Sequence, residues 1–149
     1  MANPIVKYQN FILKQFNGTG VAFGTDTVKV MLVTSSYTPT VATDIFRSAC
    51  SAYEVTGTNY TARGATIASV TATESGGTLT VTGNSIDWAQ NASGFTTAYY
   101  AVIYKDTGTD STSPLIGYIN LGANQGNVNG DLILNWNSTA SSGTIFTAA

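Results

Sequence analysis

Short runs of apolar and β-branched residues, each bounded by turn residues, recur along the chain after Gly24. The strongest are residues 95–105 and 115–121, which are joined by a polar loop and are therefore typical of a β-hairpin. The other runs with a strand pattern are residues 27–33, 65–74, 78–82, 85–89, 132–136 and 144–147. About eight strands at roughly 8–15-residue spacing, with no long helix between them, predict an all-β fold. The architecture expected is an antiparallel β-sandwich of the jelly-roll or immunoglobulin-like kind.

The alternation of apolar residues within these runs indicates which side chains form the core. The expected core residues are Val30, Leu32, Val102, Ile103, Leu115, Ile119, Leu132 and Leu134. Ser75-Gly76-Gly77 separates two of the runs, and glycines in so short a connection favour a tight hairpin turn. Residues 44–52 fit either a short helical turn or an irregular connection.

The N-terminal segment, residues 4–16, follows a different pattern. Its apolar residues recur at helical spacing, Pro4 suits the first position of a helix, and Asn3 can cap it. Asn17-Gly18 would end such a helix in a left-handed stop. An extended arm is the alternative. We therefore divide the chain into an N-terminal helix or arm, residues 1–16, and a single β-sandwich domain, residues 17–149.

Large apolar residues are too frequent in this segment for a solvated tail. We expect the segment to pack against the sandwich or against a neighbouring subunit. The interface residues expected on this basis are Ile5, Tyr8, Phe11, Ile12 and Phe16, with Leu13 adding apolar area.

Composition narrows the classes of function. Only 9% of the 149 residues are charged, against about 25% in ordinary soluble domains, and so neutral a surface is poorly defended against association. The formal net charge is −2 and Lys and Arg form no cluster, so nucleic-acid binding has no electrostatic basis. No apolar run reaches the roughly 18 residues of a membrane span, and Lys7, Asn10 and Lys14 interrupt any signal-peptide core. We expect neither nucleic acid nor a membrane as a partner.

The chain contains no His and a single Cys, Cys50. This removes His-dependent catalytic triads and the usual zinc sites, and Cys50 is expected to be a small, partly buried apolar residue. Asp106-Thr107-Gly108 matches the tripeptide of aspartic proteases, but those enzymes need two such carboxylates, so a hairpin loop is the better interpretation. Asp106 and Asp110 are candidate calcium ligands, with solvated loop acids as the favoured alternative. We expect no catalytic residue and no cofactor.

Tyrosine and tryptophan side chains are the remaining candidates for a binding surface. They could line a sugar-binding face, or they could lie in the core or in a subunit interface. We favour the second interpretation, because roughly half of the side chains on strands face inward whatever the function. The residues concerned are Tyr99, Tyr100, Tyr104, Tyr118, Trp88 and Trp136.

Several blocks of the sequence carry, in order, a resemblance to one family. They are residues 6–11 (VKYQNF), 23–32 (FGTDTVKVML), 54–66 (EVTGTNYTARGAT), 88–89 (WA), 99–119 and 129–130 (NG). These blocks are similar to small structural proteins encoded in tailed-phage virion gene clusters, which look like capsid decoration (cement) proteins or related head and tail accessory proteins. Residues 60–66 (YTARGAT) are the most specific part, and Arg63 stands where the pattern usually has Gly.

The resemblance implies a non-enzymatic virion protein that binds the major capsid protein or other virion proteins and that forms a homo-oligomer, a trimer. A tail, baseplate or fibre component is one alternative, and a carbohydrate-binding module for host recognition is another. A cement protein should bury its aromatic residues in the core or between subunits, whereas a sugar binder should expose a row of them beside a groove.

Overall fold

The computed structural model describes residues 4–136 and 142–149, and within them the chain forms antiparallel sheets and one short α-helix. A five-stranded sheet has the order β1-β8-β7-β2-β3, a three-stranded sheet has the order β10-β5-β4, and β6 pairs with β9. The strands are β1 (Val6–Lys7), β2 (Val28–Val33), β3 (Ala65–Thr66), β4 (Thr71–Ser75), β5 (Thr78–Asn84), β6 (Ile86–Trp88), β7 (Ala98–Lys105), β8 (Leu115–Gln125), β9 (Leu132–Leu134) and β10 (Ser142–Ala148). The predicted all-β, sandwich-like fold is confirmed.

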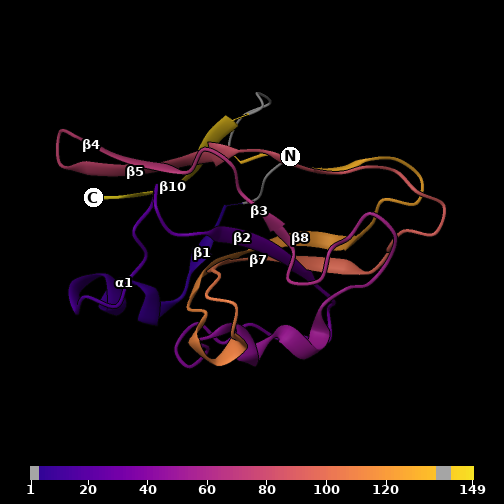
Figure 1. The fold of residues 1–149 in the computed structure, drawn as a ribbon, viewed down its shortest axis with the longest axis horizontal. Helices are drawn as coiled ribbons and strands as arrows, with labels where there is room; N and C mark the ends of the chain where they lie inside the picture. Colours follow the sequence, from indigo (N-terminus) through magenta and orange to yellow (C-terminus); the bar gives the residue numbers. More distant parts are fainter. Residues whose placement is uncertain (1–3, 137–141) are drawn as a thin grey trace.

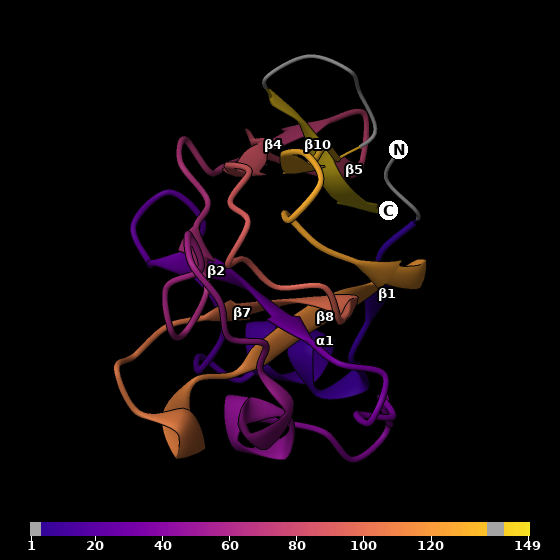
Figure 2. The ribbon, with the colours of Figure 1, turned by 90° about the vertical axis from the view of Figure 1, so that its right-hand side faces the viewer.

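The elements are arranged in layers. Figures 1 and 2 show the three-stranded sheet above one face of the five-stranded sheet. Three short 3-10 helices, η1 (Arg47–Ala49), η2 (Ser51–Tyr53) and η3 (Asp110–Thr112), belong to the loops below the opposite face. The α-helix α1 (Gln9–Phe16) follows β1 directly and lies at the β1 edge of the large sheet (Figure 1).

The central strands are buried on both faces, so the protein has two cores. On β2, Val28, Val30 and Leu32 enter the larger core, which faces the three-stranded sheet, whereas Met31 and Val33 enter a smaller second core. Each set occupies alternate positions, as the side-chain period of a strand requires. The continuous apolar run at residues 28–33 is therefore explained by a strand covered on both sides.

The second core lies between the sheet and the 3-10 loops. Its members are Tyr8, Met31, Val33, Tyr37, Cys50, Val102, Tyr104 and Leu115. Two buried hydroxyls in it satisfy each other: the Tyr8 and Tyr37 oxygens are 2.8 Å apart, and Tyr37 also donates to the Asp44 carboxylate at 2.7 Å. Such pairing removes the cost of placing polar atoms among apolar ones.

Most of the predicted core is confirmed, and one predicted strand is wrong. Of the eight expected core residues, all are buried except Leu132, which is partly buried. Residues 65–74 do not form one strand, because β3 belongs to the large sheet and β4 to the small one. The chain crosses between the sheets at Ser69, whose φ of +55° breaks the extended conformation. The hairpin turn at Gly76 and Gly77 is as predicted, with φ of +59° and +79°.

The N-terminal helix is shorter than predicted, since it begins at Gln9 and not at Pro4. Val6 and Lys7 are extended and pair with Tyr118 and Gly117 of β8. Tyr8 remains extended as well, its N–H donating to the carbonyl of Ile116 at 3.1 Å while its ring enters the second core. Ladder hydrogen bonds and burial of the ring thus outweigh helical spacing over these residues. Asn3, the predicted cap, lies outside the described residues. The predicted stop is confirmed, with the helix ending at Phe16 and Gly18 at a φ of +81°.

Candidate functional site

The two loop acids that were candidate calcium ligands lie in a cluster of ion pairs. Asp106 follows β7, Asp110 opens η3, and their partners come from distant loops, Arg47 from η1 and Arg63 from the turn before β3. The Arg63 guanidinium bridges the two acids, with Nη2 at 2.5 Å from Asp106 Oδ1 and Nη1 at 2.5 Å from Asp110 Oδ1. Arg47 Nη1 is also 2.5 Å from Asp110 Oδ1, and Arg47 forms a second ion pair with Glu54.

The cluster is tied to the sheet as well as to the loops. Lys29 of β2 places its Nζ 3.0 Å from Asp106 Oδ2, and the Gly108 N–H donates to Asp106 Oδ1 at 3.0 Å. The Tyr104 hydroxyl donates to the Arg63 carbonyl at 2.5 Å. The cluster therefore fastens three loops to one end of β2 and β7.

Protonation states in the cluster follow from these contacts. Burial would raise the pKa of Asp106, but the hydrogen bonds from Arg63 and the Gly108 N–H outweigh it and hold that pKa well below its ordinary value. The pKa of Asp110 is also lowered, because hydrogen bonds from Arg47 and Arg63 outweigh the effect of burial. Asp106 raises the pKa of Arg63 through their hydrogen bond. All of these groups are ionised at neutral pH.

This arrangement gives the two carboxylates a structural role. The guanidinium of Arg63 stands between them, at the place where a shared cation would have to lie. Among the described residues, no three His, Cys, Asp or Glu side chains are grouped so that they could hold a metal ion. Asp106-Thr107-Gly108 forms a loop turn with Gly108 at a φ of +85°, in which Ser113 accepts from the Thr107 N–H at 3.1 Å.

Arg63 has a backbone conformation that is unusual for a residue with a side chain. Its φ is +73°, in the left-handed region that favours glycine, and Gly64 follows at +79°. A Cβ on Gly64 would lie 2.0 Å from the Val30 carbonyl oxygen, so the turn lies directly against β2. Arg63 thus accepts a strained backbone where a glycine would fit, and its side chain joins Asp106 and Asp110.

Cys50 lies in the second core and is fully buried, more deeply than the partial burial predicted. Burial raises the pKa of its thiol to about 12, although the nearby Arg47 acts in the opposite direction. A thiol in this state is a poor nucleophile at neutral pH.

The aromatic candidates fall into two groups. Trp88, Trp136 and Tyr104 are buried, whereas Tyr99, Tyr100 and Tyr118 are half-buried. Tyr100 and Tyr118 pack against the second core. The half-buried tyrosines pack edge against face, with ring planes at 68° for Tyr99 and Tyr100 and at 83° for Tyr100 and Tyr118. These tyrosine rings contact one another edge to face. A sugar-binding surface would instead present a row of free ring faces.

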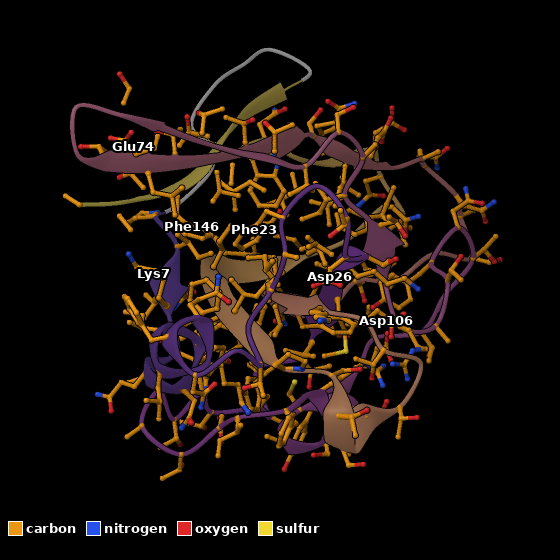
Figure 3. All side chains as sticks on the ribbon, turned by 60° about the vertical axis from the view of Figure 1, so that its left-hand side comes forward. Lys7, Phe23, Asp26, Glu74, Asp106 and Phe146 are labelled. Carbon is orange, nitrogen blue, oxygen red and sulfur yellow. The ribbon has the colours of Figure 1, made fainter. Side chains whose placement is uncertain are left out.

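The five interface candidates of the N-terminal segment divide between the interior and the surface. Tyr8 and Phe11 are buried and Ile5 is half-buried, each within this chain. Phe11 meets Phe146 of β10, at 5.7 Å between ring centroids, and Phe23, at 6.2 Å. Figure 3 shows Phe23 and Phe146 between the three-stranded sheet and the segment that carries Lys7.

The opposite side of α1 is exposed in the part of the chain that the structure describes. Phe16 is 87% exposed, Leu13 60% and Ile12 49%. We call these three side chains the α1 face. Phe11 and Gln15 hold the helix from its inner side, since Gln15 Oε1 accepts from the Val21 N–H at 2.5 Å and its Nε2 donates to the Val21 carbonyl at 3.1 Å. The helix is thus fixed in place with Ile12, Leu13 and Phe16 turned outward.

A second feature of the surface was not expected from the sequence. A pocket of about 500 Å³ lies between β9 and the far end of β8. We call it the β9 pocket; it is lined by Leu32, Trp88, Leu121, Gln125, Asp131, Leu132, Ile133, Leu134 and Asn135. The sequence predicted the β9 strand but not the pocket. The pocket depends on how β6 and β9 are placed relative to the large sheet.

Comparison with family models, curated proteins and solved structures gave no significant match for this chain. In the part of the chain that the structure describes, no helix combines the length and apolar character needed to cross a membrane.

Proposed function

We propose that this chain is a non-enzymatic structural protein of a tailed-phage virion, a decoration or cement protein that binds the head surface as an oligomer. The observation that carries the proposal is the α1 face. Three large apolar side chains are exposed side by side on a helix that is fastened to the domain by its inner side. An exposed apolar cluster on a rigid support is typical of a contact surface between proteins.

The rest of the surface supports an assembly role. Few residues are charged, and of the carboxylates that could have carried chemistry, Asp106, Asp110 and Glu54 are engaged with arginines. The tryptophans and Tyr104 are buried, as expected of a cement protein. The sequence blocks that resemble virion proteins include the turn at Arg63 and the β7–β8 hairpin, both of which build the domain and neither of which offers a catalytic constellation.

Cryo-electron microscopy of the virion that carries this chain tests the proposal. We expect density for the domain on the head shell, in contact with the major capsid protein. Density in the tail, baseplate or fibre would replace the decoration role with the alternative one, and absence from the particle would overturn the proposal. A glycan array probed with the purified chain tests the carbohydrate-binding alternative, and specific binding there would contradict our reading of the tyrosines.

A further inference from the structure

Strand β4 forms an open edge of the three-stranded sheet. It pairs with β5 on one side only, and the side chains of all five of its residues are exposed. The β4–β5 hairpin reaches out beyond the large sheet (Figure 1), and Figure 3 shows Glu74 near its projecting end. The outer side of β4 is therefore covered by no other strand of the described chain.

The register of the hairpin shows which backbone groups point outward. A two-residue glycine turn joins Ser75 to Thr78, so these two residues are the hydrogen-bonded pair that closes it. Bonded and non-bonded pairs alternate along an antiparallel ladder, which turns the N–H and C=O groups of Ala72 and Glu74 away from β5. These groups have no backbone partner within the described residues. They form a short row of free donors and acceptors, to which an added strand binds.

The other sheet edges of the described chain are protected. β1 and β3 have two residues each, and β6 and β9 have three. Beyond β1, the edge of β8 is interrupted by Gly122 at a φ of +79° and by a register shift against β7. β10 has a bulge between Thr144 and Phe146, and Lys7 Nζ donates to the Thr147 carbonyl at 3.2 Å. Very short strands, bulges and lysines are the usual protection of an edge. β4 has none of them, since it pairs over five consecutive residues without a register shift.

The hydroxyl side chains of β4 share one face of the strand, and they are Thr71, Thr73 and Ser75. In a symmetric antiparallel pair of two β4 strands centred on Thr73, that residue stands opposite its own copy and Thr71 stands opposite Ser75. Every hydroxyl then meets a hydroxyl across the contact. Thr71 and Thr82 already do so within the chain, where their Oγ1 atoms are 2.8 Å apart. Threonine and serine pairs of this kind stabilise neighbouring strands, so β4 is complementary to itself.

The same register suits the single charge of the strand. It places Glu74 opposite Ala72 of the second copy, and the outward hydrogen bonds then run between these two residues in both directions. A register centred on Glu74 would set two carboxylates against each other, which is unfavourable. A register centred on Ala72 would pair Glu74 with Val70, which lies outside the strand. Charge and hydrogen bonding thus favour the pairing that the hydroxyls favour.

We propose that β4 of one copy pairs with β4 of a second copy, so that two three-stranded sheets become one continuous sheet of six strands. A two-fold contact of this kind uses the same surface on both copies and closes at a dimer. The inference goes beyond the proposed function, which assigns no partner to this edge. Five residues per copy make a small contact, so it is weak in dilute solution. It persists where copies are held close together, as on a virion shell, and there it would join one oligomer to the next.

Proline at position 72 tests the pairing. The ring replaces an N–H that points outward, so the ladder with β5 stays intact while the edge is blocked. We expect sedimentation velocity of the purified full chain to show a reversible dimer, and Ala72→Pro to weaken it about tenfold or more, through lost hydrogen bonds. Ala72→Thr keeps the N–H and suits a strand. It is the matched control and should dimerise at least as well as the natural chain. Circular dichroism of both variants verifies the fold.

A cysteine on the two-fold axis tests the register. Opposite residues of a non-bonded antiparallel pair have Cα atoms about 4.5 Å apart, within the range of a disulfide. Thr73→Cys should therefore give a covalent dimer on a non-reducing gel, the two thiols passing two protons and two electrons to added oxidised glutathione. Ser75→Cys is the matched control on the same exposed face, but its two copies would lie about 13 Å apart along the strands. It should cross-link no more than the natural chain, whose Cys50 is fully buried.

Three results would overturn the inference. They are a natural chain that stays monomeric at all concentrations, equal dimerisation of Ala72→Pro and Ala72→Thr, and equal cross-linking of Thr73→Cys and Ser75→Cys. The second would assign the dimer to another surface, such as the α1 face, and the third would show random collision or another register. None of these outcomes bears on whether the chain lies on the phage head, which the virion map decides separately.

Discussion

Arg63 and Asp106, which are 43 residues apart in the sequence, form a hydrogen-bonded ion pair at 2.5 Å at one end of β2 and β7. Asp106 is 11% exposed and Arg63 26%, so the pair is largely shielded from water. Because Asp110 and Arg47 continue the same cluster, this contact joins the turn before β3 to the β7–β8 connection and to η1.

Replacing Asp106 tests the cluster. Asp106→Asn keeps the side-chain shape but removes the charge that balances Arg63 and Lys29, and we expect the free energy of unfolding to fall by about 1–3 kcal/mol. Urea denaturation followed by circular dichroism measures it. Glu74→Gln, on the exposed hairpin, is the matched control and should change stability by less than about 0.5 kcal/mol. Equal effects in the two variants would contradict a stabilising role for the cluster.

The effect of the Arg63 backbone conformation on stability can be measured separately from the effect of its charge. Arg63→Ala and Arg63→Gly both remove the ion pairs, but only glycine relieves the φ of +73°. We therefore expect both variants to be less stable than the natural chain and Arg63→Gly to be more stable than Arg63→Ala by about 1 kcal/mol. Thermal unfolding of the two variants side by side measures the difference. Alanine equal to or better than glycine would show that the left-handed turn is not retained.

The lowered pKa values of Asp106 and Asp110 predict acid sensitivity. Each carboxyl binds its proton more weakly in the folded than in the unfolded chain, so its contribution is complete above the unfolded pKa of about 3.9 and is lost as pH falls through the folded value. The urea midpoint should therefore drop steeply below about pH 4. Asp106→Asn should flatten this drop, and an unchanged slope in that variant would assign the acid sensitivity to other groups.

The larger core can be probed on β9, where neighbouring residues differ in burial. Leu134 is 5% exposed and Ile133 47%. Leu134→Ala should cost about 2–5 kcal/mol, through lost burial and the cavity left behind. Ile133→Ala, one residue away on the opposite face, should cost under about 1 kcal/mol. Similar costs at the two positions would mean that β9 does not hold this register against β6.

Association should depend only weakly on salt, because the contact surfaces carry few charges. Increasing the ionic strength screens the few exposed charges but leaves the apolar contact of the α1 face in place. We expect a change of a few-fold at most between about 0.05 and 0.5 M salt, and no effect of a chelator, in sedimentation experiments on the natural chain. Dissociation at moderate salt, or on chelation, would show that charge or a bound cation dominates.

The sequence predicted those structural features that depend only on neighbouring residues. The β7–β8 hairpin, the β4–β5 turn and the stop at Gly18 follow from alternation and from glycines at positive φ. The N-terminal segment shows the limit. Ile5, Tyr8 and Ile12 stand at helical spacing, yet Tyr8 is extended because its ring fits a core formed by residues such as Val102, far away in the chain. No local pattern reveals such a partner.

Neither the charged cluster nor the β9 pocket could be predicted from the sequence. Asp106 and Asp110 were candidate calcium ligands because they are two acids in one loop. Their partners, Arg47 and Arg63, come from other loops, whose positions only the fold defines. No local pattern around Arg47 or Arg63 indicates these partners. The division of the apolar N-terminal residues into buried and exposed ones also depends on the exact end of β1, which spacing alone could not predict.

The pairing of β1 with β8 has a consequence for synthesis of the protein. Val6 and Lys7 leave the ribosome about 110 residues before the strand that receives them. At roughly 5–20 residues per second, this leaves the first strand unpaired for about 5–20 s. During that time Tyr8, Phe11 and Phe16 are all without their final surroundings. The nascent chain therefore exposes several large apolar residues before their partner strand is made, and chaperone demand should be concentrated in that interval.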